Sequence, residues 1–293
     1  MLLLDGKVVR DSRVTSLKNA VRELGFTPML AILQVGDSGR SHAYVSAKQK
    51  FAERIGVRVE FLDFSPDVSG AEVLSEIERL NADPSVNGII VQLPTPRGVD
   101  SKPFIEAIAP DKDVDGLTSR NLKLLLENDR NGFIPATARG IVSLLDYYNV
   151  DLEGKDAVVV GRSLLVGKTT ALSLLNRNAT VTICHSFTRN LVSLTKAADI
   201  LVTATGMARL ITAEHVSRGQ IVVDVGINLL DGGQLSEEVG MPSKLVGDVD
   251  FDAVKDIVGA ISPVPGGVGP MTVLSLYENL LEASRRQSVS LSY

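Results

Sequence analysis

The chain has 293 residues, which suggests two domains at roughly 150 residues each, and 44% of them are hydrophobic, enough for full-sized cores. Its net charge of −5 argues against a general nucleic-acid-binding protein, because neutralising phosphates requires an excess of basic side chains. With a single cysteine the chain cannot form an intrachain disulfide. No segment approaches the roughly 20 apolar residues that cross a bilayer, and the run Met1–Leu4 is too short for a signal peptide. We therefore expect a cytoplasmic protein that does not bind membranes.

Residues 1–135 alternate short apolar runs with helical patterns. The apolar runs predict three strands, at Leu30–Val35, Val57–Phe61 and Val86–Leu93. Helical spacing predicts two helices, at Ser41–Ile55 with Ser41 as the N-cap and at Gly70–Asn81. The stretch Leu126–Gly140 is rich in charge, Asn, Gly and Pro, and it is interpreted as the connection between domains.

Residues 136–270 repeat the alternation more regularly. Short β-branched runs predict four strands, at Ala157–Val160, Thr180–Cys184, Asp199–Val202 and Ile221–Val225. Helical patterns lie between the first three of them, at Val166–Arg177 and Thr188–Ala197. Apolar strands that alternate with helices are typical of a parallel sheet covered on both faces, which binds ligands at the carboxyl ends of its strands.

These patterns predict an α/β protein of two domains with a cleft between them. Residues 1–135 would form an N-terminal βα catalytic domain, joined by a C-terminal helix within residues 271–293, and residues 136–270 a Rossmann-like, parallel-sheet, NADP-binding domain. We expect the C-terminal helix over Met271–Arg286 and a frayed end over Gln287–Tyr293.

The segment Val158–Thr170 (VVVGRSLLVGKTT) has the pattern of a strand, a glycine turn and a helix start. A P-loop has four residues between its glycines, whereas five separate Gly161 from Gly167, so the spacing disfavours a P-loop NTPase. The Rossmann pattern GxGxxG is not met either. Two interpretations remain. The segment is either a βα turn that lets a pyrophosphate approach closely or, more simply, a glycine turn without a ligand.

The second strand of this series bears on which dinucleotide would bind. NAD enzymes tend to carry a carboxylate about 20 residues after the glycine turn, where it holds the ribose 2′-hydroxyl. This strand ends in Cys184-His185-Ser186, with no carboxylate, while Arg162 and Ser163 directly follow the first glycine and suit a 2′-phosphate. The pattern favours NADP over NAD, although a solvated loop arginine is the simpler interpretation of Arg162.

Tyr44 and Lys48 form a second candidate site, because their i, i+4 spacing points both side chains the same way from one helix. A tyrosine ring can stack or donate a hydrogen bond, and burial can bring the pKa of a lysine amine towards neutrality. A partly exposed helix face is the simpler alternative. Short-chain dehydrogenases also contain YxxxK, but there the glycine turn precedes the pair, and here the order is reversed.

Other polar residues carry weaker signals. Gln92 ends an apolar strand, so its amide must find either a protein partner or a ligand. The polar stretch Asp111–Gly116 (DKDVDG) is by itself expected to be a solvated turn. The three histidines lack ligand spacing, so no metal site is predicted, and Cys184 is interpreted as strand packing.

Taken together, the chain closely resembles the bifunctional methylenetetrahydrofolate dehydrogenase/methenyltetrahydrofolate cyclohydrolase family. The matching segments occur in the family's order across nearly the whole chain, and they are Tyr44–Gly56, Gly88–Pro96, Asp111–Thr118, Val158–Lys168, Thr180–Thr188, Val223–Asn228, Gly247–Phe251 and Pro263–Thr272.

The resemblance implies NADP-dependent oxidation of 5,10-methylenetetrahydrofolate and hydrolysis of the methenyl product to 10-formyltetrahydrofolate, in a cytoplasmic homodimer that serves one-carbon metabolism and purine biosynthesis. It implies that Lys48 is the general acid/base, that Tyr44 lines the folate ring, that Gln92 orients Lys48 and that Asp115 holds the pterin. Further substrate contacts would come from Leu93, Pro263, Gly266 and Gly267. The implied NADP contacts are Gly161, Arg162, Ser163, Ser186 and Ile227.

The chain departs from the family at three places, one of which is the turn before Tyr44, GDSGRS at residues 36–41. Residues 135–140 read PATARG where the family usually has PCTPxG, and Thr169 stands where a proline usually follows VGK. The departure at residues 135–140 leaves open an enzyme that keeps only the dehydrogenase reaction. A non-catalytic dinucleotide-binding protein is a further alternative, disfavoured because Tyr44, Lys48, Gln92 and Asp115 are all present.

Overall fold

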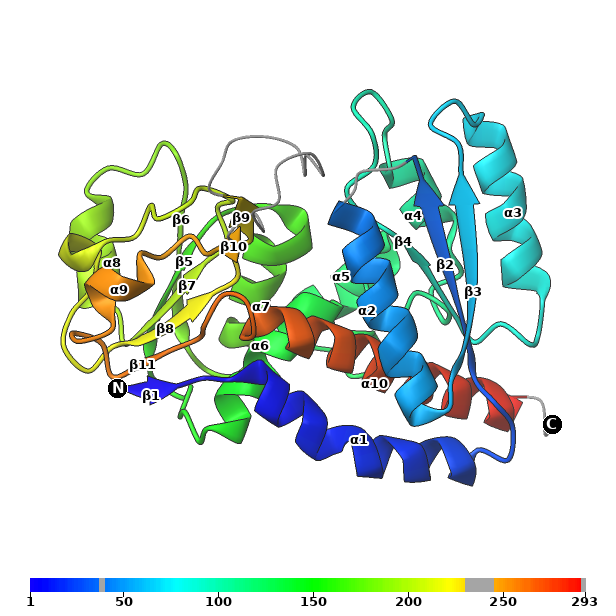
Figure 1. Cartoon of the computed structure of the whole chain (residues 1–293), viewed down its shortest axis with the longest axis horizontal. Coiled ribbons are helices and arrows are strands. Elements are labelled where there is room, and N and C mark those ends of the chain that lie inside the picture. Colours follow the sequence, from blue (N-terminus) through cyan, green and yellow to red (C-terminus); the bar gives the residue numbers. More distant parts are fainter. Residues whose placement is uncertain (37–39, 230–244, 291–293) are drawn as a thin grey trace, which may run out of the picture. The chain divides into compact units, whose positions relative to one another are not determined.

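The structure is a computed structural model that describes residues 1–36, 40–229 and 245–290. The chain forms two compact units (Figure 1). Unit 1 comprises Met1–Asp11 and Thr137–Thr272, and unit 2 comprises Ser12–Ala136 and Val273–Tyr293. The long helices α1 (Gly6–Glu23) and α10 (Val268–Ser290) each contribute to both units.

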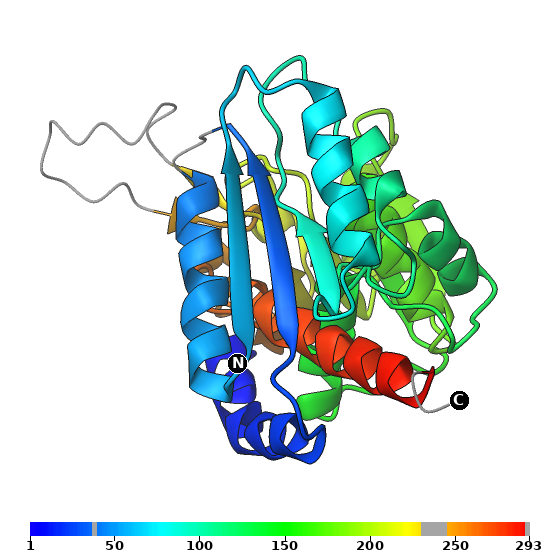
Figure 2. The same ribbon diagram turned by 90° about the vertical axis from the view of Figure 1, so that its right-hand side faces the viewer.

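Unit 2 is built on a three-stranded parallel sheet in the order β3-β2-β4, where β2 is Met29–Val35, β3 is Arg58–Phe64 and β4 is Gly88–Val91. The strands are parallel because a helix returns the chain after each of the first two, α2 (Arg40–Ile55) after β2 and α3 (Gly70–Ala82) after β3. Figure 2 shows these two helices flanking the strands.

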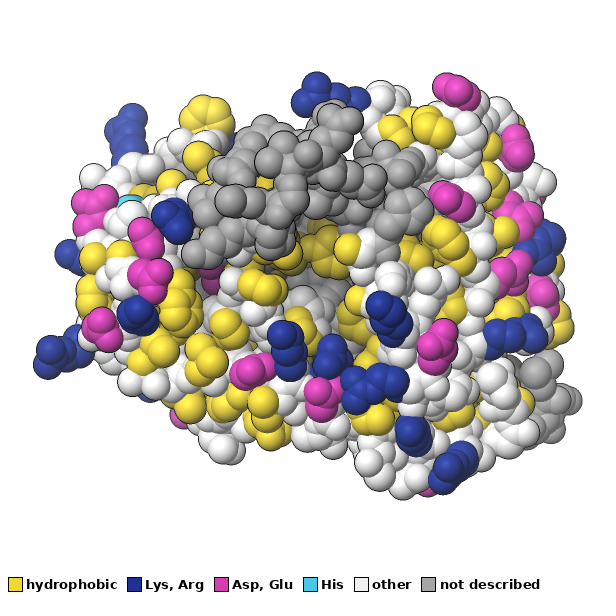
Figure 3. Space-filling model, in the orientation of Figure 1, with side chains coloured by type: hydrophobic (Ala, Val, Ile, Leu, Met, Phe, Trp, Pro, Cys, Tyr) yellow, Lys and Arg dark blue, Asp and Glu magenta, His cyan; other side chains and the backbone are white. Residues whose placement is uncertain are grey.

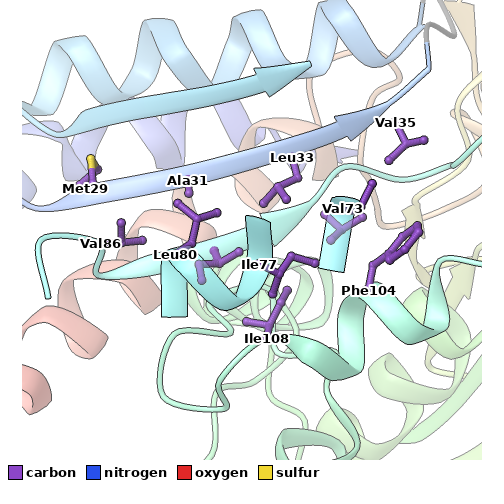
Figure 4. Packing of buried hydrophobic residues seen from close by; sticks show 12 residues of the cluster. Met29, Ala31, Leu33, Val35, Val73, Ile77, Leu80, Val86, Phe104 and Ile108 are labelled. Carbon is purple, nitrogen blue, oxygen red and sulfur yellow. The ribbon is translucent and has the colours of Figure 1, made fainter. Parts of the chain in front are cut away.

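The core of unit 2 lies between β2 and the helix α3. Alternate β2 residues from Met29 to Val35 point to one face, where they meet Val73, Ile77 and Leu80 of α3 (Figure 4). The intervening residues Leu30 and Ile32 face the opposite side and are also fully buried. Both faces of the central strand β2 are therefore covered, whereas Arg58 and Asp63 of the edge strand β3 are exposed.

The turn after α4 (Lys102–Ala107) differs from the expected solvated turn. Lys112 and Asp113 are buried, because the backbone at Asp113 pairs with Ile89 of β4. Lys112 Nζ donates to the carbonyl oxygens of Leu80, Asn81 and Asp83, at 3.0, 2.8 and 2.7 Å. These carbonyls end α3, where the helix dipole favours a positive charge.

Unit 1 contains a six-stranded parallel sheet in the order β1-β11-β8-β7-β5-β6. Its strands are β1 (Leu2–Leu3), β5 (Asp156–Val160), β6 (Thr180–Cys184), β7 (Ile200–Thr203), β8 (Ile221–Asp224) and β11 (Ala260–Ile261). The chain proceeds from β5 outward to β6 and then returns past β5 to β7, so the strand order reverses beside β5. Such a reversal is where doubly wound sheets bind ligands.

The shorter elements of unit 1 are α6 (Ala136–Tyr147), the π-helix η1 (Leu164–Lys168), α7 (Thr169–Leu175), α8 (Leu191–Ala197), the 3-10 helix η2 (Ala213–His215), the hairpin strands β9 (Asn228–Leu229) and β10 (Leu245–Val246), and α9 (Phe251–Val254). Valines, leucines and isoleucines from β5, β7, β8 and β11 form the core with α8 and α9. The predicted two-domain α/β class with a parallel-sheet unit is confirmed, whereas the cleft between domains stays a prediction.

Several predicted boundaries differ from the observed ones. Residues 1–11 group with unit 1 because β1 pairs with β11. The expected connection Leu126–Gly140 is shorter, since α5 (Ser119–Leu126) precedes it and α6 begins at Ala136. Ser41 is no N-cap, because α2 already begins at Arg40. The prediction of a frayed end from Gln287 onward is wrong for residues 287–290, because α10 continues to Ser290. The Gln287 side chain donates a hydrogen bond to the backbone carbonyl oxygen of Asn87. Residues 291–293 lie outside the described part.

In the described part of the chain, no helix combines the length and apolar character needed to span a membrane. Lys and Arg side chains are interspersed with Asp and Glu on the face shown in Figure 3, as expected from the near balance of the two signs in the sequence.

Replacing Lys112 tests its structural role. We expect Lys112→Met to lower the free energy of unfolding by about 2–4 kcal/mol, because it leaves the buried carbonyls at the end of α3 without a donor. Urea unfolding followed by circular dichroism would measure the change. Lys123→Met is the matched control: Lys123 is exposed and pairs only with exposed Glu127, so its loss should cost less than about 0.5 kcal/mol. Equal stability of the two variants would contradict the role of Lys112.

Candidate functional site

Lys48 and Gln92 meet at the carboxyl end of β4 in unit 2. Lys48 lies on α2 and its Nζ donates to Gln92 Oε1 at 2.8 Å. The Gln92 side chain is 7% exposed, and its Nε2 donates to the carbonyl oxygen of Leu93 at 2.7 Å. Because the amide nitrogen is committed to Leu93, the amide oxygen faces the lysine, and the strand-end glutamine finds a protein partner.

The backbone of Lys48 is held from α10. Tyr277 is buried, and its hydroxyl donates to the carbonyl oxygen of Lys48 at 2.8 Å. The Tyr277 ring also packs against Phe51, with ring centroids 5.6 Å apart. Helix α2 is therefore held by Tyr277 at Lys48 and at Phe51, which limits where the amine can lie.

Burial sets the protonation of the amine. Removal from water lowers the pKa of Lys48 from its usual value, and the nearby Asp115 carboxylate partly opposes this fall. Burial in turn raises the pKa of Asp115 to about 6; the Lys48 charge opposes that rise and the Asp113 carboxylate adds to it. The site thus brings together an amine that deprotonates more easily and a carboxyl that ionises less easily than in water.

A hydrogen-bonded turn positions Asp115. The buried Asp113 carboxylate accepts from the backbone N–H groups of Gly116, Leu117 and Thr118, at 2.9, 3.2 and 2.8 Å. The backbone N–H of Ala136 donates to the Asp115 carbonyl oxygen at 3.2 Å. The backbone on both sides of Asp115 is therefore constrained, and its side chain is partly exposed.

Tyr44 lies one helical turn before Lys48 on α2, as the spacing predicts, and it is 37% exposed. Leu93 directly follows Gln92 and is partly buried. Unit 2 thus carries all of the predicted catalytic residues. Lys48 is joined to Gln92 by a hydrogen bond and interacts with Asp115 through charge.

A second set of predicted residues lies at the carboxyl edge of the sheet in unit 1. Gly161 follows β5 with φ +131°, and a Cβ there would lie 2.3 Å from the carbonyl oxygen of Ala204. Only glycine fits this position, and the loop after the neighbouring strand β7 can therefore come close to the turn. This is the close backbone approach that a dinucleotide turn requires.

Arg162, Ser163 and Ser186 are exposed beyond the ends of β5 and β6. The Ser163 hydroxyl accepts from the backbone N–H groups of Val166 and Gly167, each at 3.3 Å, so it caps the helix that follows the turn. The segment after β6, from His185 to Thr188, contains no carboxylate. This edge therefore fits a dinucleotide whose ribose carries a 2′-phosphate better than one that needs a carboxylate partner.

A pair of buried aspartates, Asp224 and Asp248, lies under the loops of the same edge and was not predicted. Asp224 Oδ1 accepts from the N–H groups of Gly226 and Asp248, each at 3.0 Å. Asp248 Oδ2 accepts from the N–H groups of Thr205 and Gly206, and its Oδ1 from the amide of Asn228 at 2.9 Å. Burial, with a smaller contribution from Asp248, raises the pKa of Asp224 to about 6.

The two aspartates fix three loops by reciprocal packing against glycines. A Cβ on Gly226 would lie 2.1 Å from Asp248 Oδ1, and one on Gly247 would lie 1.8 Å from Asp224 Oδ2. Ile227, a predicted cofactor contact, follows Gly226 and is exposed, so its placement depends on this pair. The segments VDVGIN and GDVDF carry the signal, because each has an aspartate within two residues of a glycine just at or beyond the end of a strand.

Pro263, Gly266 and Gly267 lie in unit 1, before α10. Gly267 N–H donates to the Pro263 carbonyl oxygen at 2.8 Å, and the Gly266 carbonyl oxygen accepts from Gly6 N–H at 3.0 Å. This loop therefore packs on the start of α1. Among the described residues, no group of three or more His, Cys, Asp or Glu side chains could hold a metal ion.

Comparison with known proteins gives the same assignment for both units. The model of the tetrahydrofolate dehydrogenase/cyclohydrolase catalytic domain matches residues 4–115, and the model of the NAD(P)-binding domain of that family matches residues 135–288. The bifunctional protein FolD of Lactobacillus helveticus is 46% identical over 289 residues, which cover 98% of both chains. FolD of Methanoculleus marisnigri is 48% identical, covering 97% of this chain and 96% of its own.

Solved structures are similar over the same extent. FolD from Campylobacter jejuni, a methylenetetrahydrofolate dehydrogenase/cyclohydrolase, has a TM-score of 0.92 at 40% identity and covers 98% of this chain and 99% of its own. The Trypanosoma brucei enzyme, solved with NADP cofactor and an inhibitor, has a TM-score of 0.92 at 34% identity and covers 99% and 98%.

Substituting Gly247 tests the reciprocal packing. We expect Gly247→Ala to lower the free energy of unfolding by about 1–3 kcal/mol, because the added methyl group overlaps the Asp224 carboxylate. Thermal unfolding would measure the change. Gly269→Ala is the control, since a Cβ there meets nothing within 4 Å and alanine favours the helix. A Gly247→Ala protein as stable as the control would show that the loops adapt freely.

Proposed function

The chain belongs to the tetrahydrofolate dehydrogenase/cyclohydrolase family, and from this premise we propose which of its residues carry the two reactions. The protein oxidises 5,10-methylenetetrahydrofolate to the methenyl cation with NADP, and it hydrolyses that cation to 10-formyltetrahydrofolate. The predictions of family, bifunctional activity and NADP as cofactor are confirmed; the residue roles below are proposals.

The hydrogen bond between Lys48 and Gln92 is the observation that carries the assignment of the hydrolysis. Gln92 Oε1 accepts one hydrogen of the amine, so the remaining positions on Nζ face away from β4. Burial already lowers the pKa of Lys48, and the positive charge of a bound methenyl substrate would lower it further. The amine is then neutral and can act as a general base.

We assign Lys48 to proton transfer in both halves of the hydrolysis. Water adds to the methenyl carbon while Lys48 takes one of its protons. The bond from this carbon to N5 then breaks, N5 gains a proton, and the second proton of the water is released with formation of the formyl group. The ammonium form of Lys48 is placed to return the proton, so the lysine ends the cycle neutral.

Three further residues of unit 2 are proposed to hold the folate. Asp115 would accept hydrogen bonds from the pterin, and its constrained backbone suits a positioning contact. Tyr44 would stack along the aromatic ring of the substrate, since it is exposed one turn from Lys48. Leu93 would supply apolar contact beside Gln92. From unit 1, the resemblance supports Pro263, Gly266 and Gly267 as additional folate contacts.

NADP supplies the hydride acceptor when bound. The turn at Gly161 would admit the pyrophosphate, because no Cβ obstructs the backbone there. Arg162, Ser163 and Ser186 would bind the 2′-phosphate, and Ile227 would contact the nicotinamide end. The exposed positions of Arg162 and Ser186 beyond two neighbouring strands support this placement.

A homodimer in the cytoplasm, contributing 10-formyltetrahydrofolate to purine biosynthesis, is the assembly and location that the family resemblance supports. Light scattering coupled to size-exclusion chromatography would test the dimer directly.

Replacing Lys48 tests its role as acid/base. We expect Lys48→Met to reduce cyclohydrolase kcat by about 10²–10⁴-fold, while the Kd for NADP changes less than about twofold. Hydrolysis is followed by loss of methenyl absorbance and NADP binding by calorimetry. Lys50→Met is the control, because Lys50 is exposed on the same helix and should leave both unchanged. Hydrolysis retained in Lys48→Met would contradict the assignment.

Replacing Asp115 tests the electrostatic coupling. The Asp115 carboxylate raises the pKa of Lys48, so removing its charge lowers that pKa. Hydrolysis needs the neutral amine, so the limb on which kcat rises with pH should move to lower pH in Asp115→Asn. The profile of kcat against pH measures the shift. Asp111→Asn, at an exposed position of the same turn, should leave the limb in place; a limb at the same or higher pH in Asp115→Asn would contradict the coupling.

A further inference from the structure

Phe187 is an exposed aromatic residue for which the core of unit 1 offers no reason. Its side chain is 78% exposed, more than that of any other large hydrophobic residue in the described part of the chain. It lies three residues beyond the end of β6, in the segment between Ser186 and Thr188. A single exposed hydrophobic side chain is common on protein surfaces, so what points to a role for Phe187 is the contacts of its ring rather than its exposure.

The turn that carries Phe187 is well defined. His185 N–H donates to Thr188 Oγ1 at 2.8 Å, and Thr188 N–H returns to the His185 carbonyl oxygen at 2.8 Å. Phe187 N–H donates to His185 Nδ1 at 3.2 Å, and the two rings meet edge to face with centroids 6.1 Å apart. The orientation of the phenylalanine ring is therefore set by its neighbours, despite its exposure.

The ring faces Arg162. The guanidinium carbon of Arg162 is 5.5 Å from the Phe187 ring centroid, within the range of a cation–π contact. The two residues follow adjacent strands, because Val160 of β5 is in register with Cys184 of β6. Within the described residues no carboxylate pairs with Arg162, so its N–H donors are available to an anion.

We propose that Phe187 determines cofactor specificity, by holding the Arg162 guanidinium in the orientation that receives the 2′-phosphate of NADP. This inference rests on the role proposed for Arg162. A guanidinium held over an aromatic ring by a cation–π contact makes no hydrogen bond to the ring, so its N–H groups stay free for a bidentate phosphate contact. The ring also restricts a long side chain that would otherwise lose rotamer freedom on binding.

The ring could instead lie against the adenine, and this alternative makes a different prediction. Adenine is common to NAD and NADP, so an adenine contact would contribute equally to both. Support for Arg162 contributes only where a 2′-phosphate is present. Binding of 2′,5′-ADP and 5′-AMP separates the two, because these ligands differ only in the 2′-phosphate.

The test is calorimetric titration of the full-length protein with each of the two ligands. We expect Phe187→Ala to weaken 2′,5′-ADP binding by roughly two- to fivefold, the range of an exposed cation–π contact, and to leave 5′-AMP binding unchanged. Phe187→Tyr should retain the wild-type affinities, because it keeps the ring. Phe187→Leu should behave as Phe187→Ala, because it keeps an apolar side chain without the ring. Tyr147→Ala, another partly exposed aromatic of unit 1, is the control and should change neither affinity.

Arg162→Ala separates the failure of this inference from that of the underlying role. If Arg162→Ala leaves 2′,5′-ADP binding intact, the assignment of Arg162 is wrong and the inference falls with it. If Arg162→Ala weakens that binding and Phe187→Ala does not, only the inference is overturned. Equal weakening of both ligands in Phe187→Ala would also overturn it, in favour of the adenine contact. In an Arg162→Ala background, the further change Phe187→Ala should have no effect on 2′,5′-ADP.

Discussion

Parallel strand pairing is the constraint from which both candidate sites follow. In each unit a helix returns the chain after most strands, so the strands of the main sheet run parallel and their carboxyl ends meet at one edge. Polar side chains just beyond those ends gather at that edge, where a ligand can reach them. Gln92 follows β4 in unit 2, and Arg162 and Ser186 follow β5 and β6 in unit 1. The apolar character of the strands and the polarity of the residues just beyond them are two aspects of one arrangement.

Buried charge divides into two kinds in this molecule. Lys112 donates to three carbonyl oxygens, which accounts for all three hydrogens of its ammonium group and ties it to the end of α3. Lys48 donates to one neutral amide oxygen, so its amine keeps the capacity to exchange a proton with a ligand. Burial lowers the pKa of both lysines. In this molecule the two lysines therefore differ in how many acceptors bind the amine: three backbone carbonyls hold Lys112 in a structural role, whereas one amide oxygen leaves Lys48 suited to acid/base chemistry.

Local pattern was sufficient for the elements and for part of the site. The strand predicted at Thr180–Cys184 is observed with those bounds, and the i, i+4 spacing places Tyr44 and Lys48 one turn apart on α2. Local pattern failed where burial depends on distant residues. The stretch Asp111–Gly116 is polar, but Asp113 is buried because its backbone pairs with β4, and nothing nearby in sequence indicates that pairing. The aspartates at 224 and 248 escaped prediction for the same reason, since each is satisfied by the loop that the other supports.

At residues 135–140, where the chain departs from the family, the contact that supports Asp115 uses a backbone atom. The N–H of Ala136 donates to the Asp115 carbonyl oxygen, and this hydrogen bond does not depend on whether the side chain is alanine or cysteine. Ala138 is buried in the first turn of α6, where the N–H groups have no partner within the helix, so an alanine replaces a proline there without loss of a helical hydrogen bond. The altered residues thus preserve the support of Asp115, and with it the charge that partly opposes the lowering of the Lys48 pKa by burial.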